Sequence, residues 1–539
     1  MRSLILTLLV WCMCAALASV SAQDKQAAAP TAPEQGKPAT QPPVPAPANP
    51  AAAAAPASAQ TDTSRSLFEI EPNQFEAGGR WSSQQGDPAR FQRYGDFGDG
   101  ALFNLARISR EHAAGKWLFS GGADNVGWQD QRYFGVYERP GNYTVSAFWD
   151  QIPQFYSVDT STPYTASESV LTLDDSTQRA IQTGQATLSA YVPLAPQFDL
   201  RERRDIGTFR LSVTPSTRMD LTGTFTSQRH IGELPWGASF GFNNDVEVAL
   251  PYESRANDLN LGGEWTDGRQ MFRVADNGSW FNNHSDQLVW DSPLRLDDST
   301  SAPGRGRMAL WPSNSAQTIS GAGFWKWARR TQLTGALSYG FWNNDEPLQP
   351  FTINATLPQF VLPRDTALAE AHVFSTNLNF VTRPSTNWSF GARLRRYDYN
   401  NKTGHVDIPQ FINYDTSIKD STTGGPEPYA HSRTNFDADA TYSGLDPLTL
   451  TVGYAHNATG HEFRIFDGTG EDVLRLAADA IGSQWVTFRF AYEHGDRTGS
   501  GLNEDLLVQI GEQPGMRHYD LANRTRDRFN GQVDFVPDD

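Results

Sequence analysis

The sequence predicts an all-β protein, a large antiparallel transmembrane β-barrel of an outer membrane, preceded by a disordered Ala/Pro-rich segment. Stretches of about ten residues alternate polar and apolar side chains, tight turns join them in pairs, and long polar connections separate the pairs. The mean hydropathy is −0.51, and no apolar stretch after the N-terminus is long enough for a membrane helix. A barrel combines such polarity with a membrane. A large soluble β-fold also alternates, but so many long connections are unusual there.

The first 65 residues predict an export route. Residues 1–22 start with a positive charge, continue with an apolar core and end on the small residues Val20-Ser21-Ala22, so we expect a signal peptide and a mature chain that begins at Gln23. Residues 23–65 consist mainly of Ala, Pro, Gln and Thr and cannot bury enough apolar surface to offset their ordering entropy. We expect a disordered periplasmic tether there and the barrel over 66–539.

The barrel segment shows period-two hairpins. Over 207–213 the odd positions are apolar or small and the even ones polar, and the pattern resumes after the turn Thr214–Thr217. Later hairpins turn at Ala328–Arg330, Arg383–Thr386, Gly444–Pro447 and Gly482–Gln484. Earlier strands are expected near 74–82, 101–109, 115–123, 131–138 and 142–149. The total is roughly eighteen strands.

Long polar connections separate the hairpins. They are expected near 228–256, 284–316, 342–371, 398–432, 457–472 and 496–526. In outer-membrane barrels the short turns face the periplasm and the long loops face outside, and we expect the same sidedness here. A last strand over 532–536 runs into Pro537-Asp538-Asp539 without a partner after it, so we also expect a barrel that is incomplete at its C-terminal end.

Charge and motif content exclude several classes of function. A net charge of −17 argues against a nucleic-acid partner. The histidines lack metal-ligand spacing, and the acidic pairs Asp96/Asp99 and Asp297/Asp298 do not complete a calcium loop. We find no paired catalytic groups that the strand periodicity would bring together, so an enzyme is not expected. Three arginines on polar strand faces are candidate lumen contacts: Arg393, Arg395 and Arg489.

Both cysteines, Cys12 and Cys14, lie inside the signal peptide. The mature chain therefore has no thiol, no disulfide and no Cys-x-x-Cys-His haem attachment motif. We expect no cofactor of its own.

Residues 121–164 carry a distinctive order of motifs. The elements are Asn-x-Gly with a following Arg, Gly-x-Tyr, aromatic-Asp-x-Ile-Pro and Thr-Pro-aromatic, formed by Asn125, Gly127, Arg132, Gly141, Tyr143, Trp149, Asp150, Ile152, Pro153, Thr162, Pro163 and Tyr164. This segment resembles the early part of the MtrB/PioB family of decahaem-associated outer-membrane proteins, and the resemblance continues through the later hairpins. Residue types alone have a structural explanation, since Gly127 and Gly141 suit turns and Pro153 suits the end of a strand.

The resemblance implies a Gram-negative outer-membrane barrel that sheathes a periplasmic multihaem c-type cytochrome. Such a barrel forms an insulated electron conduit for extracellular electron transfer, contacts outer-membrane lipid, and leaves all haem to its partner; an extracellular cytochrome is a further partner that it allows. Some relatives carry a Cys-x-x-Cys near the mature N-terminus, which this chain lacks. The alternative is a diffusion porin or a substrate-specific channel, which the strand number does not exclude.

Overall fold

The computed structural model describes residues 73–535, apart from 113, 241–244, 422–424, 426–427, 463–465, 484–485 and 504–517. The expected signal peptide over 1–22, the expected tether over 23–65 and the last residues, Pro537-Asp538-Asp539, lie outside the described residues.

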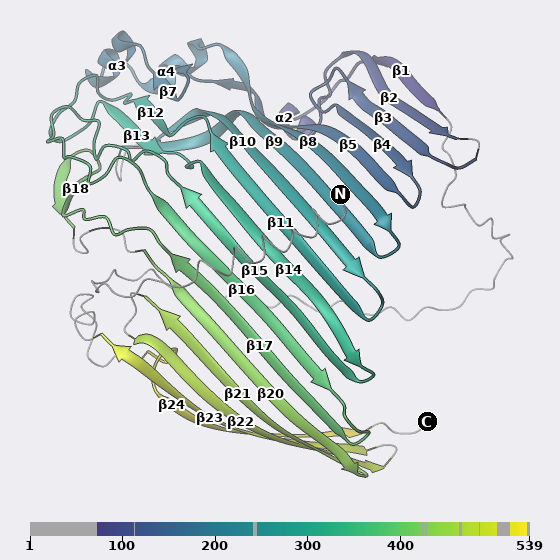
Figure 1. Cartoon of the computed structure of the whole chain (residues 1–539). Coiled ribbons are helices and arrows are strands. Elements are labelled where there is room, and N and C mark those ends of the chain that lie inside the picture. The colour runs from purple at the N-terminus through teal and green to yellow at the C-terminus, as the bar shows by residue number, and fades with distance from the viewer. Residues whose placement is uncertain are drawn as a thin grey trace.

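Eighteen strands form one antiparallel sheet, as the alternation predicts (Figure 1). In chain order they are β1 (Gln74–Arg80), β2 (Gly100–Glu111), β3 (Leu118–Val126), β4 (Arg132–Arg139), β5 (Tyr143–Ser161), β8 (Gln197–Ser216), β9 (Met219–Ser239), β10 (Asp245–Thr266), β11 (Gln270–Asn283), β14 (Asn314–Ala328), β15 (Thr331–Asn344), β16 (Ala369–Thr382), β17 (Trp388–Asn401), β20 (His431–Leu445), β21 (Leu448–His461), β22 (Phe466–Ser483), β23 (Val486–Leu502) and β24 (Arg524–Phe535).

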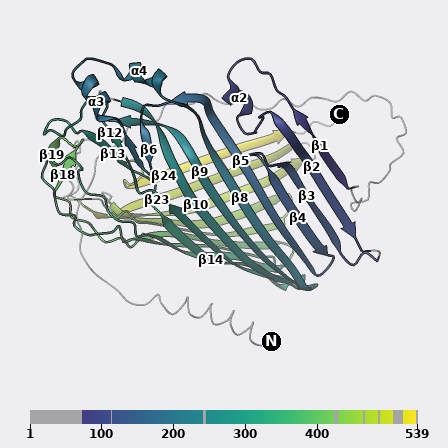
Figure 2. The ribbon, with the colours of Figure 1, turned by 90° about the horizontal axis from the view of Figure 1, so that it is seen from above.

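Each of these strands pairs with the next one along the chain. Within the described residues no ladder joins β24 to β1, so these two strands are the edges of the sheet. Figures 1 and 2 show that the sheet is twisted and strongly curved. None of the described helices is long and apolar enough to span a membrane.

The two faces of the sheet differ because successive side chains of a strand point to opposite sides. One face, here called the apolar face, exposes large apolar side chains, including Phe209, Phe225, Leu261, Leu337, Leu476, Phe488 and Phe490. Aromatic rings gather on it close to the turns, where Trp265 stacks on Phe272 and Trp388 on Phe390. Such a girdle marks a membrane interface. The opposite face, here called the polar face, lines the lumen of a barrel.

The connections are short at one end of the sheet and mostly long at the other. Two predicted long loops are wrong: most of 228–256 belongs to β9 and β10, and most of 457–472 belongs to β21 and β22. The extensions of β21 and β22 carry polar or small residues on both faces and so lack the alternation that identified the other strands. The tip of β10 still alternates, but its apolar residues Val246, Val248 and Leu250 lie on the face that is polar elsewhere, and there they are buried. The backbone ladders of these strands continue nonetheless.

The long connections build a folded unit at their end of the sheet. A four-stranded sheet forms from β6 (Thr165–Ser167), β7 (Val170–Thr172), β12 (Gln287–Asp291) and β13 (Arg305–Ala309). Beside it lie α3 (Asp175–Gln182), α4 (Leu188–Tyr191), the 3₁₀ helix η1 (Val192–Leu194) and the hairpin β18 (Gln410–Asn413) and β19 (Ser417–Asp420), while α2 (Pro88–Gln92) precedes β2. We call connections 162–196, 284–313, 345–368 and the described part of 402–430 the loop cap.

The loop cap has its own apolar core, which rests on the extended tips of β9 and β10. Leu288 and Trp290 of β12 and Leu250 of β10 are almost completely buried in it. Because β9 and β10 rise beyond the membrane band, they offer the surface on which the cap packs.

Candidate functional surface: the polar face and its loop cap

The glycines of the recognised motif lie in turns, as predicted. Gly127 has φ +89° between β3 and β4, and Gly141 has φ +72° between β4 and β5. These are conformations that glycine adopts without strain. Asn125 also has a positive φ, 49°, and its side-chain amide donates to Asp130 at 3.0 Å.

The motif residues Arg132 and Asp150 form a cross-strand ion pair on the polar face. Both guanidinium–carboxylate contacts measure 3.2 Å, and Asp150 is buried. On the neighbouring strands Arg107 contacts Asp124 at 2.6 Å. The polar face of β2–β5 is therefore a row of compensated charges.

The middle of the motif belongs to β5 itself. Tyr143 stacks on Tyr137 at the turn end, and Trp149 lies on the apolar face, where a Cβ at Gly207 would approach its ring to 3.3 Å. Ile152 is half-buried on the polar face. Pro153 does not end a strand, contrary to the prediction, because β5 runs on to Ser161.

The position of Pro153 explains why the sheet tolerates it. The pairing of β4 with β5 stops at Asp150, whereas β8 pairs with β5 along its whole length. Beyond Asp150 one side of β5 is thus free of a ladder, and a residue without an N–H group fits at such an edge.

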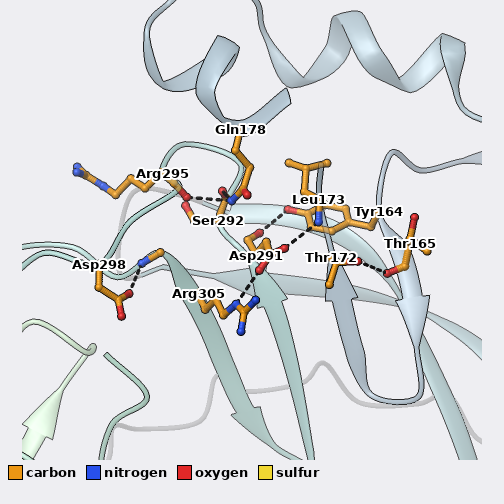
Figure 3. A network of polar contacts seen from close by, with 11 residues as sticks. Tyr164, Thr165, Thr172, Leu173, Gln178, Asp291, Ser292, Arg295, Asp298 and Arg305 are labelled. Atoms are coloured by element: carbon orange, nitrogen blue, oxygen red, sulfur yellow. Dashed lines mark hydrogen bonds and ion pairs between the residues drawn. The ribbon is translucent and has the colours of Figure 1, made fainter. Parts of the chain in front are cut away.

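The end of the motif leaves the sheet and enters the loop cap (Figure 3). Thr162 accepts a hydrogen bond from the backbone N–H of Tyr164 at 3.3 Å, with Pro163 between them. Tyr164 is buried, and its hydroxyl donates to the backbone carbonyl of Asp291 at 2.9 Å. Burial raises the pKa of Tyr164 far above its usual range, so it stays a neutral donor.

Asp291 connects the two parts of the cap sheet. Its carboxylate accepts from the backbone N–H of Leu173 at 2.9 Å and contacts Arg305 at 2.8 Å (Figure 3). Gln178 of α3 donates to the backbone carbonyls of Ser292 and Arg295. The Thr-Pro-Tyr element is therefore an anchor that ties β5 to the cap.

Three connections of the cap are joined by buried polar contacts. Asn354 is completely buried and donates to the backbone carbonyls of Ser299 at 2.9 Å and Asp415 at 3.0 Å. The Asp298 carboxylate accepts from the backbone N–H groups of Gly304 and Ala355. Connections 284–313, 345–368 and 402–430 consequently form one unit.

Three of the acidic residues that do not complete a calcium loop have structural roles. Besides Asp298, Asp96 accepts from the backbone N–H of Gln129, and Asp99 accepts from Ser82. In the described part of the chain, no three or more His, Cys, Asp or Glu side chains come together so that they could hold a metal ion.

The three candidate lumen arginines all lie on the polar face, but their surroundings differ. Arg489 contacts Asp534 at 3.0 Å and Asp479 at 3.9 Å. Arg393 and Arg395 are exposed and form no ion pair with any described residue. Arg433 on the adjacent strand is also exposed and forms no ion pair with any described residue. The sequence prediction missed Arg433 because it lies directly after a predicted loop. Its position has the same parity as Asn435 and Asp437, which places it on the same face.

The polar face changes character along the sheet. The polar face of β14–β16, here called the neutral wall, consists of Ala, Ser, Thr, Asn, Gln and Gly with a few larger apolar residues, and Lys326 near the turn is its one charge. The polar face of β17–β24, here called the charged wall, carries arginines 393, 395, 433, 475, 489, 497, 524, 526 and 528 and the acids 437, 439, 471, 479, 493 and 534.

Solved structures with which the chain can be superposed include outer-membrane receptors. The ferric yersiniabactin uptake receptor FyuA from Yersinia pestis aligns with 10% identity and a TM-score of 0.31, covering 75% of this chain and 60% of the receptor. The siderophore receptor PiuA from Acinetobacter baumannii aligns with 10% identity and a TM-score of 0.31, covering 80% and 65%. The chain thus spans less than two thirds of the length of either receptor.

The family comparison is decisive. No curated protein matches the chain. The family model described as "Putative outer membrane beta-barrel porin, MtrB/PioB" matches residues 83–539, which include all eighteen strands of the sheet except β1. The chain belongs to the MtrB/PioB family of outer-membrane β-barrel porins.

Proposed function

We propose that this porin sheathes a periplasmic multihaem c-type cytochrome and so forms a conduit for electrons across the outer membrane. The observation that carries the proposal is the charged wall, whose arginine and carboxylate side chains suit a protein partner that presents complementary charges. The haem belongs to the partner, and the barrel supplies position and insulation. An extracellular cytochrome that receives or delivers electrons at the loop cap fits the same arrangement.

The long connections also favour a sheath over a constricted pore. In a diffusion porin one long loop folds inward and narrows the lumen. Connection 345–368 instead forms its hydrogen bonds with itself, with neighbouring connections and with Asn344 at the end of β15. These contacts hold it in the loop cap and leave the middle of the polar face to a partner.

Co-purification and redox transfer test the proposal. Extraction of the full chain in mild detergent should retain a multihaem cytochrome in a one-to-one complex, whereas the barrel alone should show no haem absorbance. Liposomes that hold both proteins should reduce an enclosed dye from an impermeant external donor, and barrel-only liposomes should not. A native barrel that never retains a cytochrome and that passes small sugars freely would instead be a diffusion porin.

The proposal includes the orientation of the chain, with the short turns and residues 23–65 in the periplasm. Protease added to intact cells should cut within 284–316 or 398–432 and spare Thr214–Thr217 and Arg383–Thr386. Cleavage of 23–65 from outside would reverse the orientation.

A further inference from the structure

Three arginines form a compact group on the charged wall. Arg393 and Arg395 are two residues apart on the same face of β17, and Arg433 on β20 lies diagonally across the ladder from Arg395, which is paired with Asn435. Diagonal neighbours of this kind have Cα atoms roughly 7–8 Å apart, within reach of long side chains. We call Arg393, Arg395 and Arg433 the arginine group.

The strands around the group supply little neutralising charge. Arg395 lies between Asn377 and Asn435, and Arg433 lies between Tyr397 and Thr459. Arg393 faces Asp437 across the ladder, but that carboxylate is bound by Arg475 of β22 at 3.1 Å. Asp439 is a diagonal neighbour of Arg393 on the same face and forms no ion pair with a described residue.

Three of the other arginines of the same wall, Arg475, Arg489 and Arg524, form ion pairs within the sheet, whereas Arg497, Arg526 and Arg528 form none with a described residue. Arg475 also reaches Glu493, and Arg524 contacts Glu471 at 2.6 Å. The exposed guanidinium groups of Arg393, Arg395 and Arg433 lack such partners among the described residues, so the group is a local excess of positive charge.

An aromatic cluster adjoins the group on the side of the loop cap. The ring of His431 lies 5.5 Å from Tyr397, 5.7 Å from Tyr399 and 5.5 Å from Tyr429, and Trp342 lies 6.0 Å from Tyr399. The His431 Nδ1 atom is enclosed and has no hydrogen-bond partner. Tyr397 and Trp342 remain partly exposed, so a ligand of the arginines would also contact aromatic rings.

We infer that the arginine group is a docking site for carboxylates of the sheathed partner, at the loop-cap end of the lumen. The inference rests on the proposed function and deepens it. Guanidinium groups bind carboxylates with two parallel hydrogen bonds, and adjacent rings favour a carboxylate that is carried by an apolar or planar group. The partner has two sources of this chemistry, which are the propionates of a haem and the side chains of Asp or Glu.

The test uses the full-length barrel with its cytochrome. The variant Arg395→Gln/Arg433→Gln removes two charges and keeps most of the side-chain length. Binding of the cytochrome to the immobilised barrel should weaken by about tenfold or more, and release should occur at lower salt. The control Arg210→Gln/Arg273→Gln removes two charges from exposed positions elsewhere on the polar face, each without an arginine on a paired position, and should change binding much less.

A redox titration of the complex separates the two sources of carboxylate. If haem propionates dock at the group, removal of the nearby positive charges shifts one haem to a lower potential. If Asp or Glu side chains dock there, binding weakens and the titration is unchanged. Equal binding by the test and control variants would overturn the inference and leave the sheath intact, whereas failure of the wild-type barrel to bind a cytochrome would refute the proposed function itself.

Discussion

Strands β14–β16 and β17–β24 belong to one sheet and share one apolar face, but the polar face of the first group, the neutral wall, differs from that of the second group, the charged wall. Leu378 of β16 pairs directly with Leu394 of β17, so the apolar side continues across the boundary between the walls without a change. On the other side, the small uncharged residues of β14–β16 give way to nine arginines and six acids on β17–β24. The lipid therefore constrains one face of every strand, whereas the composition of the other face differs between the two groups of strands.

The largest change in the free energy of unfolding is expected on the apolar face, which the two groups of strands share. Leu337→Arg on β15 and Leu476→Arg on β22 each place a cation near the middle of the apolar face. Both should lower the free energy of unfolding in a bilayer by about 2–4 kcal/mol. Denaturant titration of barrels refolded in lipid vesicles measures this value.

The controls for that prediction are the polar-face neighbours Ala336→Arg and Ala477→Arg. Each should unfold within about 0.5 kcal/mol of the wild type, because its new charge faces the lumen. Equal penalties on the two faces would contradict the assignment of lipid and lumen sides.

An intermediate change in the free energy of unfolding should distinguish the charged wall from the neutral wall. The Glu471 side chain is only 16% exposed and contacts Arg524 at 2.6 Å. Glu471→Gln should lower the free energy of unfolding by about 1 kcal/mol, since it weakens a partly shielded ion pair. The matched change in the neutral wall, Ser338→Ala, should stay within about 0.5 kcal/mol. If Arg524→Gln added its full cost on top of Glu471→Gln in a double-mutant cycle, the two residues would not be coupled.

The smallest effect should come from an exposed pair in the charged wall. Arg489 and Asp479 are about half-exposed and Asp534 is 35% exposed, so water already screens their interaction. Arg489→Gln should change the free energy of unfolding by about 0.5 kcal/mol or less, and the change should vanish at high salt. A loss well above that value, insensitive to salt, would show that the charged wall is held together by its ion pairs.

Period-two alternation was sufficient to predict the strands and their two faces. The hairpins at Ala328–Arg330 and Gly444–Pro447 are confirmed, since β15 begins at Thr331 and β21 at Leu448. The pattern failed over 457–472, where both faces carry polar or small residues, and over 228–256, where the apolar residues of β10 change to the opposite face and pack into the loop cap.

The residues of the loop cap could not be placed by any local pattern. The hydroxyl of Tyr164 donates to the backbone carbonyl of Asp291, which lies 127 residues away in the sequence. No periodic pattern around either residue predicts this contact. Arg433 could have been found from its parity with Asn435 and Asp437, had the strand been extended through the polar stretch before it. Local alternation therefore predicts the strand segments that contact lipid, whereas the contacts of the loop cap join residues that lie far apart in the sequence.

The buried amide of Asn354 has a consequence for how this surface can diversify. The side chain of Asn354, in connection 345–368, donates hydrogen bonds to connection 284–313 and to the described part of connection 402–430. Replacement of one of these connections by that of a homologous protein should therefore remove hydrogen-bond partners from the other two. At the opposite end, neighbouring tight turns within the described residues are joined by hydrogen bonds to backbone carbonyls, such as that from the Thr214 N–H group to the carbonyl of Asn142, and not by one buried side chain that bridges several of them. Each of these turns should therefore accept an inserted tag or epitope on its own. Variation on the cap side should therefore be inherited in linked blocks, whereas the turn side can change one hairpin at a time.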